Sequence, residues 1–428
     1  MPPLPPSARH KAAVLLDQII GEGRLMPELI ASGTLDRLPP EDRARAQRLA
    51  MDTLRGMERA DRILSKFLRK PPPLTVHNLL RVGTVELCTG GDAHGVVNDM
   101  VAIIGRHRRY GNLKGLMNAV LRKVAEDGPR KWHDLRIPRL RNWLREPLVK
   151  AYGQGVMNAM EKVHFAGAPL DLTAKGDPDA LAKATGGTVL PTGTVRLREA
   201  GQVSALPGYD AGDWWVQDAA AAIPAKVLDP KPGEAILDLC AAPGGKTLQL
   251  AAAGATVTAL DVSATRMERV TQNLARTGLT AACLTEDALT HSGGPYDAIL
   301  LDAPCSATGT IRRHPDLPFA KDGSEFGALI DLQQAMLDHA LSLLKPGGRL
   351  VYCTCSLLPD EGEVQIEDAL ARHPGLVADR AALERPGIDP AWITEEGGLR
   401  LRPDYWADRG GMDGFYISVL RREPPKDN

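Results

Sequence analysis

Apolar residues recur with helical spacing through the first 127 residues of the chain. In residues 113–124 they occupy positions 113, 116, 117, 120, 121 and 124, with basic residues on the other face. Spacings of three and four residues are typical of an amphipathic helix. Gly128-Pro129 predicts a boundary after this pattern. We therefore predict an all-helical domain over residues 1–129.

From Trp214 onwards, short apolar runs alternate with helical patterns. The expected strands are 235–239, 255–260, 282–286, 297–301, 348–354 and 414–421. Residues 263–277 are predicted to form a helix that Ser263 caps and Gly278 ends. This alternation predicts a doubly wound, Rossmann-like α/β sheet over residues 214–428. Between the two domains, residues 130–213 predict a small α+β connector.

A loop of small residues follows the strand expected at 235–239 and leads into a helical pattern. It consists of Cys240, Ala241, Ala242, Pro243, Gly244, Gly245 and Lys246. Such a loop lets the backbone approach a ligand, and the helix start offers free N–H groups. A Walker A loop would need glycine at position 240, and no G-x-G-x-x-G occurs. A nucleoside ligand with acidic contacts, such as S-adenosylmethionine, therefore fits better than a bound phosphate.

Acidic residues end the next strands of this pattern. They are Asp261, Asp287 and Asp302. The carboxyl ends of strands face the ligand crevice in an open α/β sheet. We expect Asp261 to bind ribose hydroxyls and Asp287 to receive an adenine amino group. One such acid is more often a helix cap or turn residue, so the prediction depends on all three together with the loop.

Charge is distributed unevenly along the chain. Residues 1–150 contain 27 Lys/Arg and 16 Asp/Glu, although the whole chain has a net charge of −1. This basic portion indicates a polyanionic partner, most simply nucleic acid. The alternative is that its arginines only lie on helix faces exposed to solvent. The candidate RNA contacts are Arg108, Arg109, Lys114, Arg312, Arg313 and His314.

The composition, with 43% hydrophobic and 25% charged residues, is typical of a globular protein. No apolar run is long enough to span a membrane, and the start of the chain has no secretory signal pattern. We therefore expect a cytoplasmic protein without membrane contact, and a monomer.

Six cysteines lie at positions 88, 240, 283, 305, 353 and 355. Their spacing predicts no disulfide framework, and zinc is disfavoured because no C-x₂₋₄-C pair occurs. We expect no metal. Cys305 follows Asp302 in an Asp-Ala-Pro-Cys-Ser segment, and Cys355 lies in Thr-Cys-Ser fifty residues later. Any one of these cysteines could simply be buried and inert.

The chemistry that remains for these segments is thiolate attack on a pyrimidine. A thiolate added at carbon 6 of cytosine makes carbon 5 enamine-like and able to accept a methyl group, which divides one difficult step into two. Asp302 is a candidate to hydrogen-bond nitrogen 3 of the ring. We expect the base to leave its stack, since carbon 6 is not open to attack within a helix.

Residues 238–247, 302–306 and 354–356 resemble the cofactor, Pro-Cys and Thr-Cys motifs of the Nol–Nop–Sun group of RNA cytosine-5 methyltransferases. Residues 114–122 resemble the NusB-like domain of the RsmB family within that group. The resemblance implies S-adenosylmethionine-dependent methylation of cytosine in small-subunit (16S) ribosomal RNA.

The same resemblance implies a role for each matched residue. Cys355 is similar to the nucleophile and Cys305 to the cysteine that helps to release the product. Residues 240–246, Asp261, Asp287 and Asp302 correspond to cofactor-binding positions.

Two alternatives stay open at this point. In the DNA cytosine-5 methyltransferases the nucleophile is the cysteine of a Pro-Cys pair, which would be Cys305 in this chain. A protein of a different class, an RNA-binding or assembly factor with a silent cofactor domain, would account for the basic front portion alone.

Overall fold

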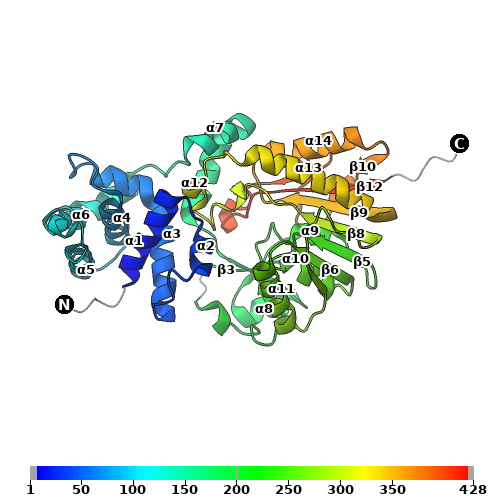
Figure 1. Ribbon diagram of the computed structural model, residues 1–428, viewed down its shortest axis with the longest axis horizontal. Coiled ribbons are helices and arrows are strands. Elements are labelled where there is room, and N and C mark those ends of the chain that lie inside the picture. The colour runs from blue at the N-terminus through cyan, green and yellow to red at the C-terminus, as the bar shows by residue number, and fades with distance from the viewer. Residues whose placement is uncertain (1–6, 199–200, 423–428) are drawn as a thin grey trace. The chain divides into compact units, whose positions relative to one another are not determined.

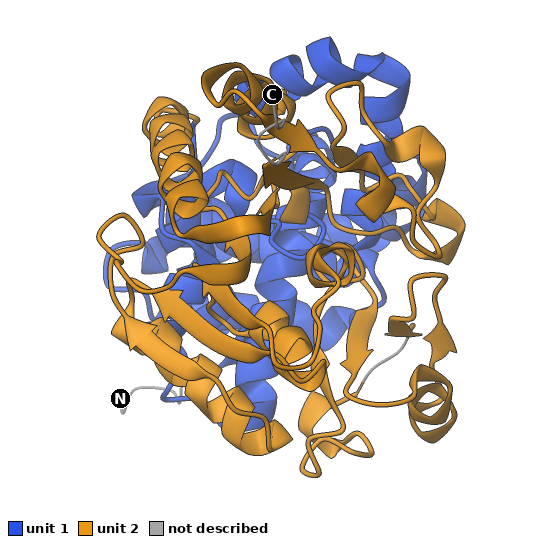
Figure 2. Ribbon diagram, turned by 90° about the vertical axis from the view of Figure 1, so that its right-hand side faces the viewer, with its two compact units in different colours: residues 1–167, 311–322 blue, residues 168–310, 323–428 orange. Residues whose placement is uncertain are grey.

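The computed structural model describes residues 7–198 and 201–422, and the chain divides into two compact units (Figure 2). Unit 1 contains residues 1–167 and 311–322, and unit 2 contains residues 168–310 and 323–428. The segment 311–322 thus belongs to unit 1, although the sequence on both sides of it belongs to unit 2.

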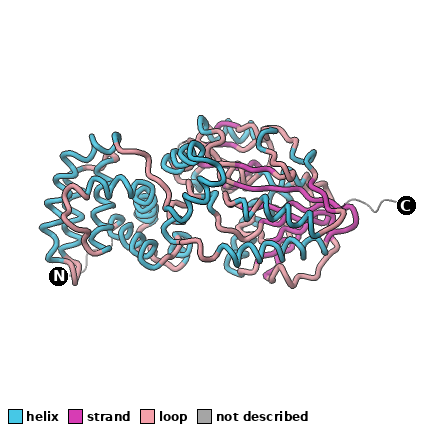
Figure 3. Tube along the Cα trace, turned by 90° about the horizontal axis from the view of Figure 1, so that it is seen from above, coloured by secondary structure: helices cyan, strands magenta, loops and turns pink. Residues whose placement is uncertain are grey.

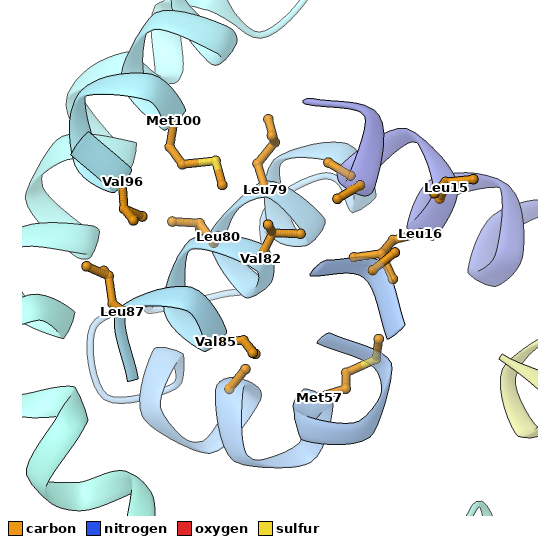
Figure 4. Close-up of a cluster of buried hydrophobic side chains, with 14 of the residues drawn as sticks. Leu15, Leu16, Met57, Leu79, Leu80, Val82, Val85, Leu87, Val96 and Met100 are labelled. Atoms are coloured by element: carbon orange, nitrogen blue, oxygen red, sulfur yellow. The ribbon is translucent and has the colours of Figure 1, made fainter. Parts of the chain in front are cut away.

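Unit 1 is helical. Its helices are α1 (Ala8–Glu22), α2 (Met26–Ala31), α3 (Pro40–Leu64), α4 (Leu74–Cys88), α5 (Ala93–Gly105), α6 (Lys114–Asp134), α7 (Asn142–Ala166) and the short α12 (Leu317–Ala320) (Figure 1). Their apolar faces meet in one core, in which Leu15, Leu80 and Met100 are fully buried (Figure 4). None of the described helices is long and apolar enough to span a membrane.

Helices α6 and α7 of unit 1 both continue past a glycine. Helix α6 continues through Gly128 and Pro129 to Asp134, so the boundary predicted at this pair does not coincide with a helix end. A Cβ atom on Gly128 would lie 2.9 Å from the Cys88 Sγ, and the glycine therefore permits close packing against α4. In α7 the chain kinks at Gly153, whose φ is 82°.

Unit 2 begins with a small antiparallel sheet in the order β2-β3-β1-β4. Its elements are β1 (Leu170–Ala174), α8 (Pro178–Thr185), β2 (Thr188–Val189), β3 (Val195–Leu197) and β4 (Trp214–Val216). A buried ion pair between Arg196 and Asp171, 2.6 Å apart, joins β3 to β1.

The second sheet of unit 2 contains eight strands in the order β10-β12-β9-β8-β5-β6-β7, with β11 pairing with β12. The strands are β5 (Ala235–Leu239), β6 (Thr256–Asp261), β7 (Ala282–Thr285), β8 (Tyr296–Asp302), β9 (Leu344–Thr354), β10 (Leu376–Ala378), β11 (Leu399–Leu401) and β12 (Phe415–Arg422). Strands β5 to β9 are parallel to one another, whereas β12 is antiparallel to β9. The helices are α9 (Ile223–Leu228), α10 (Gly245–Ala252), α11 (Ala264–Thr277), α13 (Phe326–Ser342) and α14 (Glu363–Arg372) (Figure 3).

The predicted fold class is confirmed, with an all-helical N-terminal portion and a Rossmann-like sheet after it. The strand expected at 235–239 is β5, and the other five expected strands are also present with small shifts of their ends. Helix α11 is capped by the Ser263 side chain, which accepts a hydrogen bond from the Arg266 backbone, and it ends at Gly278. The three-domain division stays a prediction.

Candidate active site

The loop after β5 has a backbone that suits close approach to a ligand. Cys240 has φ 60° and Gly244 has φ 102°, and α10 begins directly afterwards at Gly245. A side chain on Gly244 would be strained by this φ, and its Cβ would lie 3.2 Å from Val270. The backbone N–H groups at the start of α10 are therefore open to an acceptor group of a ligand.

A buried carboxylate lies beneath this loop. Asp238 is fully buried in β5 and accepts a 2.6 Å hydrogen bond from the Thr247 hydroxyl through Oδ2. Its Oδ1 has no hydrogen-bond partner among the described residues. Burial raises the pKa of Asp238 to about 7, because the ionised form is poorly solvated there.

The two acids expected to bind the nucleoside lie at the same edge of the sheet as the loop. Asp261 ends β6, is 2% exposed and accepts hydrogen bonds from the Ser263 backbone at 3.0 Å and the Ala242 backbone at 3.3 Å. Asp287 follows β7, is exposed, and accepts a hydrogen bond from the Leu289 backbone at 2.9 Å. A buried carboxylate bound to the loop and an exposed one nearby suit a ligand with hydroxyl and amino groups.

The cysteines of the Pro-Cys and Thr-Cys segments lie together. The Sγ atoms of Cys305 and Cys355 are 3.4 Å apart, within hydrogen-bond distance for sulfur. They meet because β8 and β9 are parallel neighbours, with Asp302 opposite Cys353, so the segments after both strands emerge side by side. Both sulfurs are free, and both residues are partly exposed.

Asp302 links Cys353 of β9 to the loop after β5. Its Oδ2 accepts a 2.7 Å hydrogen bond from the Lys246 ammonium, and its Oδ1 accepts one from the Cys353 thiol at 3.4 Å. The Asp302 side chain is 29% exposed, whereas Lys246 and Cys353 are buried. Asp302 can therefore meet a bound molecule while its position is held by both neighbours.

The thiols of this site differ in acidity. The hydrogen bond with Cys355, and then burial, raise the pKa of Cys305 well above its usual value. Burial and the nearby Asp302 carboxylate raise the pKa of Cys353, and burial raises that of Cys240 to about 12. Burial lowers the pKa of Lys246, but the Asp302 carboxylate outweighs it and raises that pKa above its usual value. At neutral pH Cys305, Cys353 and Cys240 are therefore thiols.

Glu361 supports the Cys305 segment, and sequence reasoning did not identify it. Its buried carboxylate accepts hydrogen bonds from the Ser306 backbone at 2.8 Å, from the Ser306 hydroxyl and from Gln333 Nε2 at 2.9 Å. Its backbone carbonyl accepts hydrogen bonds from Tyr352 and Thr354 of β9. No spacing in the sequence marks this acid, because its partners are 28 and 55 residues away.

The candidate RNA contacts differ in exposure. Arg108, Arg109 and Lys114 of unit 1 are exposed, while Arg313 and His314 are partly buried. Arg312 is 0% exposed, and its backbone carbonyl accepts a hydrogen bond from Arg55. A fully buried guanidinium does not reach a phosphate, so this structure argues against the RNA contact predicted for Arg312, which fills the interior instead.

Family models match both parts of the chain. Residues 225–421 match the model described as 16S rRNA methyltransferase RsmB/F, and residues 6–126 match the NusB family. The ribosomal RNA small subunit methyltransferase B of Pseudomonas putida is 36% identical over 444 residues, which cover 97% of each chain.

Solved structures share the fold. The crystal structure of PH0851 covers 97% of this chain and 99% of its own, with a TM-score of 0.74 and 22% identity. NSun6 from Pyrococcus horikoshii, solved with SFG, covers 66% of this chain and 98% of its own, with a TM-score of 0.55 and 21% identity. The full-length match to the Pseudomonas relative, together with both family models, shows that this chain belongs to the RsmB/F family of 16S rRNA methyltransferases.

Proposed function

We propose that this protein transfers a methyl group from S-adenosylmethionine to carbon 5 of a cytosine in small-subunit ribosomal RNA, through a covalent bond between Cys355 and the base. The observation that carries the proposal is the 3.4 Å approach of the Cys305 and Cys355 sulfurs beside Asp302. Two thiols and a carboxylate around one partly exposed site are the groups that the covalent mechanism requires.

The loop after β5 and the two acids at the same sheet edge would hold the cofactor. Residues 240–246 provide backbone groups, Asp261 would hold the ribose, and Asp287 would accept from the adenine amino group. Lys246 and Asp302 complete this surface on the side of the cysteines. The cofactor, when bound, supplies an electrophilic methyl group on a sulfonium.

The chemistry of the chain's own residues begins with sulfur. The Cys355 thiolate attacks carbon 6, forms the C–S bond and pushes the electron pair of the 5,6 double bond towards carbon 5. For this step Asp302 must carry a proton, which it donates in a hydrogen bond to nitrogen 3, so that the negative charge that develops on the ring is stabilised. Lys246 holds the Asp302 side chain in place. After methylation a base removes the proton at carbon 5, the double bond re-forms, and the C–S bond breaks.

The raised pKa of Cys305 favours Cys355 as the nucleophile. A Cys305 thiol that stays protonated has an S–H group that can donate a hydrogen bond to the Cys355 sulfur, 3.4 Å away. The same S–H group stabilises the Cys355 thiolate when it leaves carbon 6. Cys305 therefore acts in product release, as the family motif implies, and the opposite assignment would place the attack on a thiol whose pKa is raised.

A covalent trap separates the two assignments. With RNA containing 5-fluorocytosine, which cannot lose a proton from carbon 5, wild type is expected to form a denaturation-resistant adduct, while Cys355→Ala forms none. With ordinary RNA, Cys305→Ala is expected to accumulate the adduct because release fails. The reverse pattern would assign the nucleophile to Cys305.

Cofactor binding tests the rival class of a silent RNA-binding factor. Calorimetry of the whole chain with S-adenosylmethionine is expected to show binding that Asp261→Ala weakens, since Asp261 is bound to the loop backbone. Absence of binding by wild type would favour the rival.

RNA contacts are proposed at Arg108, Arg109, Lys114, Arg313 and His314, with the target base rotated out of its stack.

A further inference from the structure

Unit 1 contains a cavity that the proposed chemistry does not use. Its volume is about 400 Å³, and its walls come from α3, α4, α7, the segment between α6 and α7, and the segment 311–319. This volume lies in the range of small-ligand pockets, which are about 300–1,000 Å³. The lining is a mixture of aromatic rings, arginines and paired acids.

Aromatic rings and guanidinium groups stack along the walls. The guanidinium of Arg141 lies 4.6 Å from the ring centre of Phe319. The guanidinium of Arg59, which does not itself line the cavity, lies 4.5 Å from the ring centre of Phe165. Phe165 and Phe319 both line the cavity. Aromatic faces and arginine planes are the surfaces on which proteins stack unpaired nucleic-acid bases.

The acids of the lining already have basic partners. Asp61 binds Arg81 at 2.7 Å, Glu58 binds Arg136, and Glu161 binds Arg145 at 2.8 Å. Arg139 and Arg141 also line the cavity and are exposed, and neither forms an ion pair with a carboxylate among the described residues. Two cations therefore remain available for an anionic ligand.

A buried histidine adds a polar group to the wall. His164 is 6% exposed, and neither ring nitrogen has a hydrogen-bond partner among the described residues. Burial, reinforced by the charge of Arg312, lowers the pKa of His164 to about 3. The ring is thus neutral at pH 7 and has one donor and one acceptor, as the edge of a nucleobase does.

We propose that this cavity binds one unstacked nucleotide of the RNA substrate, with its base against the aromatic and guanidinium surfaces of Phe165 and Phe319 with Arg141, and its phosphate on Arg139. This inference rests on the proposed function, which supplies the RNA. Duplex RNA does not fit, because a cavity of about 400 Å³ has room for a single flipped nucleotide and not for a helix. A free nucleotide has the same chemistry, and the experiment separates the two sources.

Binding of a fluorescein-labelled, single-stranded RNA octamer to the whole chain, followed by anisotropy over a range of salt, tests the proposal. We expect Arg139→Gln combined with Arg141→Gln to weaken binding at least tenfold and to lower the slope of log K against log salt by ~0.7 for each arginine. Arg130→Gln is the matched control, because Arg130 is an exposed arginine of α6 outside the cavity. Phe319→Leu keeps the apolar wall but loses stacking, and is expected to weaken binding ~5-fold or more.

Cross-linking gives a second readout that does not depend on affinity. RNA substituted with 5-bromouridine is expected to cross-link, under ultraviolet light, to peptides containing Phe165 or Phe319. Wild-type affinity and slope in the double variant, or no cross-link to these peptides, would overturn the inference. Binding of cytidine monophosphate that the variants abolish, with RNA binding unchanged, would also overturn it and assign the cavity to a free nucleotide.

The outcomes also separate this inference from the proposed function. If the inference alone fails, the variants bind RNA as wild type does and the 5-fluorocytosine adduct still forms. If the proposed function alone fails, no adduct forms with any variant, while the loss of RNA affinity in the cavity variants persists.

Discussion

Replacement of Glu361 by alanine should loosen the segment that holds Cys305. The Glu361 carboxylate is fully buried and accepts three hydrogen bonds, two from Ser306 and one from Gln333. Ser306 directly follows Cys305, so this carboxylate fixes the backbone beside the thiol. We expect Glu361→Ala to keep the fold of unit 2 but to raise the frequency with which this segment opens.

The size of the destabilisation depends on which hydrogen bonds Ser306 and Gln333 keep once the Glu361 carboxylate is removed. The Ser306 hydroxyl keeps Ser356 at 3.1 Å, and Gln333 keeps the Pro304 carbonyl at 2.8 Å. The Ser306 backbone N–H loses its acceptor, and an unsatisfied buried donor costs about 1–3 kcal/mol. The loss of hydrogen bonds to the charged carboxylate adds to this cost. Part of the cost is offset, because the variant no longer has to bury a carboxylate charge on folding. We expect a loss of about 3 kcal/mol for Glu361→Ala and about 1 kcal/mol for Glu361→Gln.

Hydrogen exchange followed by mass spectrometry measures this opening directly. A loss of about 3 kcal/mol corresponds to roughly 100-fold faster exchange of the Ser306 amide in peptides that span residues 303–309. Glu367→Gln is the control, because Glu367 is an exposed acid on α14. The reasoning is refuted if Glu361→Ala exchanges at the wild-type rate in these peptides.

Two further predictions concern the buried acid and the buried thiol of the site. Because folding raises the pKa of Asp238 to about 7 from an unfolded value of about 3.9, the folded state binds the extra proton, and the free energy of unfolding should fall as pH rises from 4 to 7. Asp238→Asn should remove about 3 kcal/mol of the fall between pH 5 and pH 8, which urea midpoints at these two pH values measure; an unchanged pH dependence would contradict the raised pKa. Cys353 is fully buried with a raised pKa, so iodoacetamide at pH 8 should leave it unmodified, and peptide mapping that finds it alkylated before Cys355 would contradict this.

The sheet was predictable because local signals agreed with the long-range structure. Apolar runs of strand length became β5 to β9, and the capping serine and terminal glycine of α11 lie where their chemistry requires. The end of α6 was not predictable from Gly128-Pro129, because the glycine serves packing against Cys88 of α4. Rules based on neighbouring residues in the sequence do not take account of a contact with a residue 40 positions away.

The site was predictable where chemistry is concentrated in a short segment. Asp302, Cys305 and Cys355 lie in two segments whose meeting follows from the parallel pairing of their strands. The position of Arg312 was not predictable, because a run of basic residues looks alike whether its side chains are solvated or buried. Glu361 was missed for the opposite reason, since it is one of several acids in the segment Pro-Asp-Glu-Gly-Glu (359–363) and no local feature distinguishes it.

The register between β8 and β9 decides which sulfur meets which partner. Cys353 lies opposite Asp302 inside the sheet, so its thiol is buried and donates to that carboxylate. Cys355 lies one residue beyond the end of β9, where the segment from β8 brings Cys305 within 3.4 Å. Because side chains alternate their direction along a strand, a shift of one residue would turn Cys353 away from Asp302 to the opposite face of the sheet. The difference between a fully buried thiol at position 353 and a partly exposed one at position 355 therefore depends on strand pairing as much as on the identity of either residue.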